Sequence, residues 1–234
     1  MSNYKTAYSY NAENGEYLGE AKAWESPLEP GVYHLPAGAT YTTPPAHGEH
    51  EAARWNTITG AWELVPDYRG EIYWNKSTRE KVEIKELGIT PAPELTDIEP
   101  TDHEAEWNGT TWEIPLAVCR KRKLNEVKTA FNAYVAGSIT TTQGYKMQFG
   151  ESDSLKLEGS IKLMEAQGIA VAYLTDAGDD THYDIPLATI KAVQLEMLAA
   201  YGAAHARKQQ LRAQVEAAAD KATLDTIVIT WEAE

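Results

Sequence analysis

Two short segments of this 234-residue sequence gather residue types that could hold a metal ion. The first is His47-Gly48-Glu49-His50-Glu51, which offers two imidazoles and two carboxylates within five positions, a donor set suited to zinc or nickel. The second, residues 176–184, is rich in aspartate but departs from the calcium-loop pattern and lacks its closing glutamate. A metal site also needs fixed geometry and outer-shell support, which neither segment supplies. We therefore expect a solvated loop and a hairpin tip with Asx turns.

Catalytic signatures are missing from the sequence. There is no glycine-rich dinucleotide or phosphate loop, no nucleophile elbow and no His-Glu-x-x-His zinc motif, to which residues 50–54 come nearest. Cys119, the single cysteine, adjoins the basic run Arg120 to Lys123 on a predicted helix, where we expect a semi-buried, unreactive thiol. Carboxylate pairs for glycoside hydrolysis are too easily drawn from so acidic a chain to be informative. We predict a protein that is not an enzyme and needs no cofactor or metal.

Four tryptophans form two similar pairs. Trp55 and Trp62 lie in ARWNTITGAWELVPD, residues 53–67, and Trp107 and Trp112 lie in the shorter AEWNGTTWEIP, residues 105–115. If exposed, the rings would stack on sugars or form an interaction surface; if buried, they would be the core of a small β module. We expect core use for most of them, because this part of the chain is poor in Ile, Leu and Phe.

Loop length predicts how each tryptophan pair is arranged. A two-residue turn at Asn108-Gly109 places Trp112 on the same face as Trp107, in a diagonal position. A four-residue loop over residues 56–59 gives the first pair the same relation. We therefore interpret both segments as hairpins.

The net charge of −14 is unevenly distributed along the chain. Residues 1–115 carry 8 Lys/Arg against 20 Asp/Glu, and residues 116–234 carry 13 against 15. The first part should therefore repel nucleic acid and anionic membranes. The N-terminus has no apolar run typical of a signal peptide, and no stretch of about 18 apolar residues follows. We expect neither nucleic acid nor a membrane as a partner.

The first part of the chain reads as short β elements joined by Pro/Gly turns. Residues 4–10 alternate aromatic and polar side chains, residues 11–15 are turn-forming, and residues 16–21 resume an extended pattern, which together predicts a hairpin. Residues 26–45 contain five prolines and two glycines, so we expect an ordered but irregular connection.

The same order then recurs in shortened form. Residues 73–80 resemble residues 8–16, TPAPELTDIEP at 90–100 resembles the proline-rich connection, and the second tryptophan pair follows. We infer an internal duplication. The predicted domains are an N-terminal β module at 1–70, a second, shortened β module at 71–115, and an α+β domain at 116–234.

The last part is predicted to be a helix-rich α+β domain, and the whole chain is α+β in class. We expect a helix at 116–136, a hairpin around Gln143-Gly144, a helix capped by Ser152 or Asp153 that ends at Gly168, a hairpin turning at 177–180, a long helix at 187–220 and a strand at 224–231. Apolar residues of the long helix recur at alternating spacings of three and four, as in a coiled coil, and predict a homo-oligomer through the 187–220 helix.

The ordered motifs of residues 4–75 resemble the N-terminal module of bacteriophage tail-fibre assembly proteins. They are the opening YSYNAENGEYLGEA, the proline-rich connection, the first tryptophan pair and VPDYRGEIYWN. The remainder, from MQFGESDSLKLEG onward, resembles an uncharacterised C-terminal domain of phage tail proteins, for which the resemblance implies a location and no mechanism.

The resemblance implies a non-enzymatic factor that binds the C-terminal end of a trimeric tail fibre and assists its folding. It implies that the protein acts in the host cytoplasm during assembly. The alternative is that the protein is retained in the virion tail, where it would contact host-surface glycan. The positions that match the family's characteristic module are Trp55, Trp62, Asp67, Arg69 and Gly70. The role expected for them is structural more than direct binding. As partner-binding residues we name Trp55, Trp62, Trp107, Trp112, Asp67 and Arg69.

Overall fold

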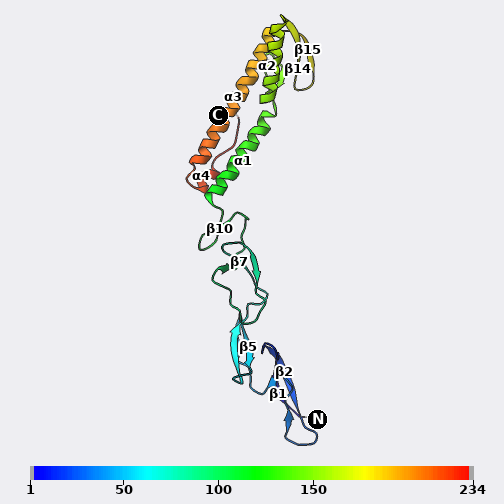
Figure 1. The fold of residues 1–234 in the computed structure, drawn as a ribbon, viewed down its shortest axis with the longest axis vertical. Helices are drawn as coiled ribbons and strands as arrows, with labels where there is room; N and C mark the ends of the chain where they lie inside the picture. Colours follow the sequence, from blue (N-terminus) through cyan, green and yellow to red (C-terminus); the bar gives the residue numbers. More distant parts are fainter. Residues whose placement is uncertain (1–2, 232–234) are drawn as a thin grey trace. The chain divides into compact units, whose positions relative to one another are not determined.

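The computed structural model describes residues 3–231 and divides the chain into two compact units, residues 1–113 and 114–234 (Figure 1). Within the described range, unit 1 is made of short antiparallel strands, whereas unit 2 combines helices with β-hairpins. The α+β class is confirmed. The division of the first part at residue 70 stays a prediction. No helix among the described residues is both long and apolar enough to cross a membrane.

Unit 1 contains short strands whose order repeats. The strands are β1 (Tyr4–Tyr10), β2 (Tyr17–Glu25), β3 (Tyr33–His34), β4 (Ala39–Thr40), β5 (Glu51–Asn56), β6 (Ala61–Pro66), β7 (Ile72–Asn75), β8 (Lys81–Glu83), β9 (Leu95–Thr96), β10 (Glu106–Trp107) and β11 (Trp112–Glu113). The first sheet has the order β3-β2-β1-β4, and the second has the order β8-β7-β9. A separate hairpin follows each sheet, β5-β6 after the first and β10-β11 after the second. The duplicated arrangement inferred from the sequence is thus present in the strand order.

The turns repeat as closely as the strands. In three of them an asparagine carbonyl accepts the N–H of the residue four positions later, and that residue has a left-handed backbone. The three bonds run from Gly15 to Asn11 at 2.8 Å, from Gly60 to Asn56 at 2.9 Å and from Arg79 to Asn75 at 2.7 Å, with φ angles of 78°, 66° and 65°. In each turn the asparagine side chain also accepts a backbone N–H two residues on. Asparagine and glycine favour this geometry because one bonds its own turn and the other tolerates positive φ.

The aliphatic core of unit 1 is small. A buried cluster there consists of Ala7, Ala23 and Ala39, with Ala21 and Tyr33 packed against it. Three alanines bury little apolar area, so the strands need additional packing. Aromatic rings supply it, as described below for the tryptophan hairpins.

Unit 2 holds the longest elements of the chain. They are α1 (Leu116–Val135), β12 (Ser138–Thr140), β13 (Lys146–Gln148), α2 (Glu151–Ala166), β14 (Val171–Thr175), β15 (Thr181–Pro186), α3 (Leu187–Ala217) and α4 (Lys221–Asp225). The predicted helices and both predicted hairpins are confirmed. The prediction that Ser152 or Asp153 caps α2 is wrong, because Gly150 occupies the N-cap position and no side chain caps the helix. The long helix ends at Ala217 instead of Asp220, since Asp220 caps the next helix by accepting the N–H of Thr223 at 2.7 Å.

Helix α3 is shared between two cores. Its first half joins α2 and both hairpins in a cluster that includes Phe149, Ile161 and Val193. Its second half joins α1 and α4 in a cluster that includes Val127 and Leu211. Figure 1 shows α1 and α2 alongside different parts of α3. The predicted apolar seam of α3 is therefore occupied within unit 2, so the homo-oligomer inferred from that seam loses its physical basis and stays untested.

The predicted strand at residues 224–231 is wrong. Residues 221–225 form α4, and residues 227–231 run without a ladder partner. Their side chains are used for packing, since Ile227 and Ile229 join the second core and Trp231 stacks on Tyr134 at a ring-centroid distance of 5.7 Å. The alternating apolar pattern reflects the packing of Ile227, Ile229 and Trp231 on the second core, and none of the described strands pairs with this segment.

Candidate functional sites

The two tryptophan pairs occupy directly opposed positions on their hairpins. Trp55 pairs with Trp62 in β5-β6, and Trp107 pairs with Trp112 in β10-β11. The ring centroids lie 5.3 Å and 5.4 Å apart in edge-to-face arrangements. The predicted diagonal placement is therefore wrong, although the same-face prediction holds.

The chemistry of the asparagine turns explains the register. In the second hairpin, the N–H of Asn108 donates to the carbonyl of Thr111 at 3.0 Å. The Asn108 side chain also accepts the N–H groups of Thr110 and Thr111. The chain thus turns one residue later than a two-residue Asn108-Gly109 loop would allow. In the first hairpin Asn56 pairs with Ala61, so the loop covers residues 57–60 instead of 56–59.

Each hairpin is fixed by one indole N–H. Trp62 Nε1 donates to the carbonyl of Thr42 at 2.7 Å, and Trp112 Nε1 donates to the carbonyl of Ile98, also at 2.7 Å. The two acceptors lie two residues beyond Thr40 and Thr96, whose hydroxyls accept the N–H of Thr42 and Ile98. The two copies therefore use the same sequence of bonds to connect the proline-rich segment to the tryptophan hairpin.

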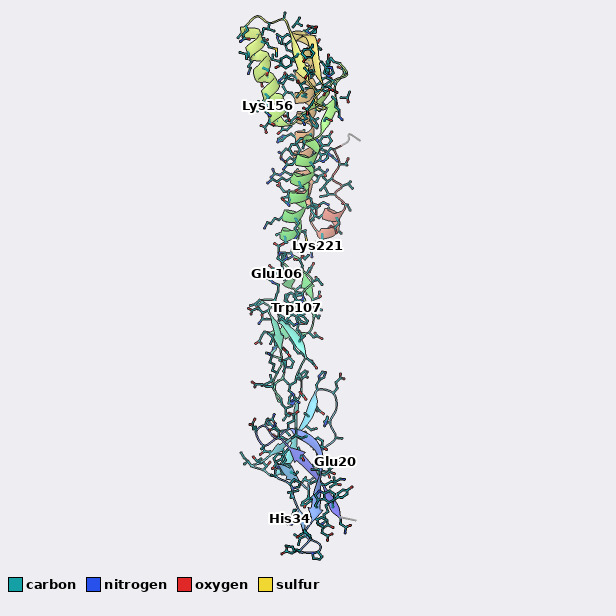
Figure 2. All side chains as sticks on the ribbon, turned by 90° about the vertical axis from the view of Figure 1, so that its right-hand side faces the viewer. Glu20, His34, Glu106, Trp107, Lys156 and Lys221 are labelled. Carbon is teal, nitrogen blue, oxygen red and sulfur yellow. The ribbon has the colours of Figure 1, made fainter. Side chains whose placement is uncertain are left out.

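The tryptophans differ in exposure. Trp112 is buried, with 7% of its surface exposed, whereas Trp55, Trp62 and Trp107 are half-buried. Tyr10 stacks on Trp55 at a centroid distance of 5.7 Å, which links the first sheet to the first hairpin. Figure 2 labels Trp107 beside Glu106 on β10. The rings thus contribute to packing within each module, and three of them retain an accessible part.

Asp67 and Arg69 form an ion-pair network with Glu16. The Arg69 guanidinium donates to both Glu16 carboxylate oxygens, at 3.0 Å and 2.6 Å, and to both Asp67 oxygens, at 2.7 Å and 2.8 Å. Its hydrogen bonds to Asp67 hold the pKa of that carboxyl below its usual range, and those to Asp67 and Glu16 raise the pKa of Arg69. Glu16 precedes β2, so the network ties the segment after β6 to the first hairpin. Glu16 could not be identified as a member of this network from the sequence, because its partner Arg69 is 53 positions away.

The metal-ligand segments do not gather into metal sites. His50 Nδ1 lies 2.8 Å from Glu71 Oε1 and its ring stacks on Tyr68, so it is engaged in packing. Asp176 accepts the N–H groups of Gly178 and Asp180, as expected for a hairpin tip with an Asx turn. Among the residues described, carboxylates and an imidazole approach one another closely at the consecutive residues 102–104, in an irregular segment.

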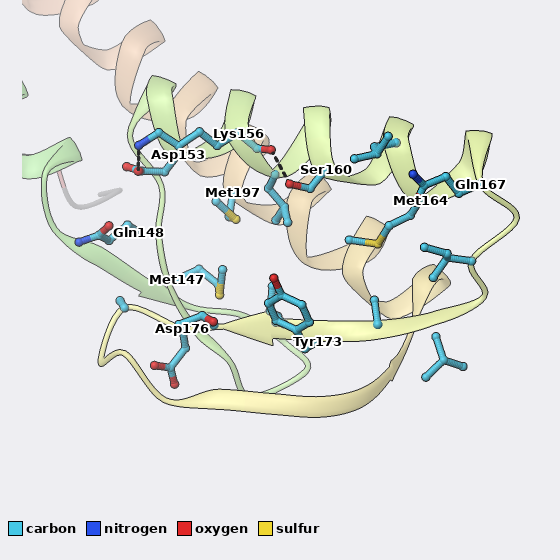
Figure 3. Close-up of a pocket in the computed structure, with 18 residues that line it drawn as sticks. Met147, Gln148, Asp153, Lys156, Ser160, Met164, Gln167, Tyr173, Asp176 and Met197 are labelled. Atoms are coloured by element: carbon cyan, nitrogen blue, oxygen red, sulfur yellow. Dashed lines mark hydrogen bonds and ion pairs between the residues drawn. The ribbon is translucent and has the colours of Figure 1, made fainter.

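Unit 2 contains a groove that the sequence did not predict. It has a volume of about 700 Å³ and lies between α2 and β14 (Figure 3). Its apolar lining comes from several elements and includes Met147, Leu157, Leu163, Met164, Ile169 and Met197. A groove of this kind depends on how distant elements pack, so no local sequence pattern announces it. It is a typical size for a ligand or peptide site.

Comparison with known proteins finds a matching domain family and several similar proteins. Residues 118–228 match a family described as a domain of unknown function (DUF4376). The chain is 34% identical over 160 residues to the prophage tail fiber assembly protein homolog TfaR of Escherichia coli K12, covering 68% of this chain and 80% of that protein. It is also 34% identical over 106 residues to the tail fiber assembly protein of Escherichia phage lambda, covering 45% of this chain and about half, 52%, of that protein. No solved structure matches the chain.

Proposed function

Because this chain belongs to the tail fiber assembly protein family, we propose that it binds the C-terminal end of a phage tail fibre and assists the folding or trimerisation of that fibre. The observation that carries the proposal is the similarity over 160 residues to a protein named for tail fibre assembly. The proposed role involves binding alone and no catalytic step. It takes place in the host cytoplasm, where fibres are made.

The partly exposed tryptophans of unit 1 are the proposed contact surface. Trp55, Trp62 and Trp107 are half-buried, and each is held by edge-to-face contact with the opposite tryptophan of its hairpin. Rigid aromatic rings suit protein interfaces because they offer a large contact area at a small entropic cost. Trp112 packs against Trp107 across its hairpin, and Asp67 and Arg69 tie the segment after β6 to Glu16 through the bonds described above.

Co-expression with the fibre from the same phage tests the proposal. We expect the fibre to form soluble trimers with this protein and to aggregate when an unrelated soluble protein replaces it, as measured by size-exclusion chromatography with light scattering. A fibre that trimerises equally well without this protein would contradict the proposal. Pull-down with N-terminal and C-terminal fibre fragments locates the binding segment, and we expect capture by the C-terminal fragment.

A second candidate function is a structural or receptor-binding component of the virion tail that contacts host-surface glycan. An exposed aromatic pair favours it: Tyr4 and Trp24 are 48% and 47% exposed, with ring centroids 5.4 Å apart. Lys22 Nζ lies 4.5 Å from the Tyr4 ring centroid, so a cation adjoins the rings. Aromatic faces beside a polar group suit sugar stacking. Mass spectrometry of purified particles decides whether the protein stays in the virion, and its absence there removes this candidate.

A further inference from the structure

Strand β14 has one open edge. Its register pairs Ala172 with Ile185 and Leu174 with His182 of β15. The flanking bonds, from Leu187 N–H to the carbonyl of Ala170 and from Asp176 N–H to the carbonyl of Asp180, show that the even-numbered residues bond to β15. In an antiparallel ladder the alternate residues direct their N–H and C=O groups to the opposite edge. These residues are Val171, Tyr173 and Thr175.

No other strand completes this edge within the part of the chain that the structure describes. The N–H of Ala177, just beyond β14, donates to the carbonyl of Lys146 at 2.7 Å. β13, which begins at Lys146, makes no ladder with β14. An open strand edge is a ready template for pairing with another extended chain. The open edge of β14 would therefore be completed by a chain in an extended conformation.

The groove beside β14 is apolar and adaptable. Three of its lining side chains are methionines, which come from β13, α2 and α3 and adjust to ligands of different shape. Leu163 of α2 is 59% exposed at the groove, and Val171 and Tyr173 are 51% and 65% exposed. Burying these side chains under a ligand would be favourable. The occupant should therefore carry apolar side chains.

Charge distinguishes the two ends of the groove. Asp153 and Asp176 lie at one end, and Gln167 lies at the other (Figure 3). Lys156 is paired with Asp153 at 3.8 Å, and His182 is paired with Asp176 at 3.1 Å. Asp179 and Asp180 bond to Asp176 within the hairpin tip and so add negative charge at the same end. A cationic group on the occupant would therefore be attracted to this end, because both carboxylates of the lining lie there.

We propose that the α2-β14 groove binds an extended segment of another protein, which pairs antiparallel with β14, has aliphatic side chains at alternate positions and carries a lysine or arginine at its N-terminal end, near Asp176. Antiparallel pairing is favoured because its hydrogen bonds are somewhat stronger than those of a parallel pair. Backbone bonds give such a complex its affinity, and the side-chain pockets give it specificity. The proposal rests on unit 2 alone and does not depend on the proposed fibre role.

Fluorescence anisotropy with the full-length protein tests the proposal. The probe is a fluorescein-labelled peptide, Lys-Val-Thr-Val-Thr-Val, with the label at its C-terminus. Two matched peptides replace the lysine by glutamate or the central valine by proline. We expect saturable binding of the lysine peptide, several-fold weaker binding of the glutamate peptide, and roughly tenfold weaker binding of the proline peptide, which loses a strand bond.

Variants of the protein locate the site. Leu163→Gln lowers the apolar content of the groove, and Leu155→Gln is its matched control, because Leu155 is 57% exposed on the same helix and does not line the groove. We expect several-fold weaker peptide binding for the first variant and unchanged binding for the second. Tyr173→Pro removes an N–H from the open edge, where proline is tolerated, and we expect roughly tenfold weaker binding.

Three outcomes would overturn the proposal. The first is no binding of the lysine peptide at millimolar concentration. The second is equal binding of the proline peptide, accompanied by displacement with laurate, which would indicate a site for apolar small molecules. The third is an equal effect of Leu163→Gln and Leu155→Gln. If circular dichroism shows that Tyr173→Pro is unfolded, the leucine pair and the three peptides still decide the question.

Discussion

Trp62 and Trp112 each donate an indole N–H to a backbone carbonyl at 2.7 Å. Replacing either ring by phenylalanine removes that bond, leaves the carbonyl of Thr42 or Ile98 without this donor and reduces the buried apolar area. We expect Trp62→Phe and Trp112→Phe to lower the free energy of unfolding by about 1–3 kcal/mol. Urea denaturation followed by circular dichroism measures this change.

Trp55→Phe is the matched control for these variants. Trp55 stacks on Tyr10 and opposes Trp62, but its indole N–H has no hydrogen-bond acceptor among the described residues. A phenylalanine keeps most of the ring contact, so we expect a loss below about 1 kcal/mol. Equal losses for Trp55→Phe and Trp62→Phe would mean that ring size, and not the N–H bond, determines stability.

Asp67 gives unit 1 a pH-dependent contribution to stability. Its hydrogen bonds with Arg69 lower its pKa in the folded state, so the ion pair stabilises the fold above the unfolded pKa of about 3.9. This contribution is lost as the pH falls through the lower, folded pKa. We expect Asp67→Asn to reduce stability at pH 7 by about 1 kcal/mol, since the pair is partly exposed. Below the folded pKa, thermal unfolding should show little difference between variant and wild type.

The sequence predicted that the tryptophans lie in pairs on hairpins but not which residues face each other. Trp55, Trp62, Trp107 and Trp112 were identified from spacing, and the same face was predicted for each pair. Each turn lies one residue later than predicted, which shifts the cross-strand partner by two residues, because an asparagine side chain can close a turn that backbone counting does not foresee. Whether these residues and the Asp67-Arg69 pair bind a partner stays a prediction.

At the scale of elements, the first of the three asparagine turns places a glycine where a side chain cannot fit. Gly15 has φ of 78°, and a Cβ there would lie 2.4 Å from the carbonyl oxygen of Trp55. Trp55 N–H also donates to the Gly15 carbonyl at 2.7 Å, so this turn is packed against the first tryptophan hairpin. An added methyl group would force the turn away from β5. The turn therefore couples the first sheet to the hairpin.

Gly15→Ala is expected to lower the free energy of unfolding by more than about 2 kcal/mol, from the left-handed backbone and the steric clash together. Gly60→Ala is the matched control, because Gly60 has φ of 66° in the equivalent turn and no atom lies within 4 Å of its added Cβ. We expect a loss of about 1 kcal/mol there. Differential scanning calorimetry compares the two, and equal losses would show that close packing at Gly15 has no energetic effect.

Elements with strong local signals were predictable. The helices of unit 2 follow apolar periodicity, and the hairpins follow turn residues such as those at 11–15 and 177–180. The segment 224–231 was not, because alternating apolar residues do not reveal whether a partner strand is available. The groove beside β14 was also beyond sequence reasoning, since its lining is brought together from β13, α2, β14 and α3.

At the scale of the whole molecule, the chain contains two units with separate cores. Unit 1 relies on small alanine and aromatic clusters joined by hydrogen bonds, and unit 2 has two aliphatic clusters along α3. The sequence suggested this contrast through its tryptophans, six of which precede residue 116. Composition could indicate the change of architecture but not the division of α3 between two cores, which depends on where α1 and α2 pack.

Because each unit has its own buried residues, we expect residues 1–113 and 114–234 to fold when produced separately. Unit 2 should be the more stable, since its clusters bury larger aliphatic side chains such as Ile190, Met197 and Leu211. The check is calorimetry of each fragment and of the full chain. Two transitions in the full chain, each matching one fragment, would agree with independent units. A 114–234 fragment that lacks a cooperative transition would instead show that unit 2 needs unit 1 to fold.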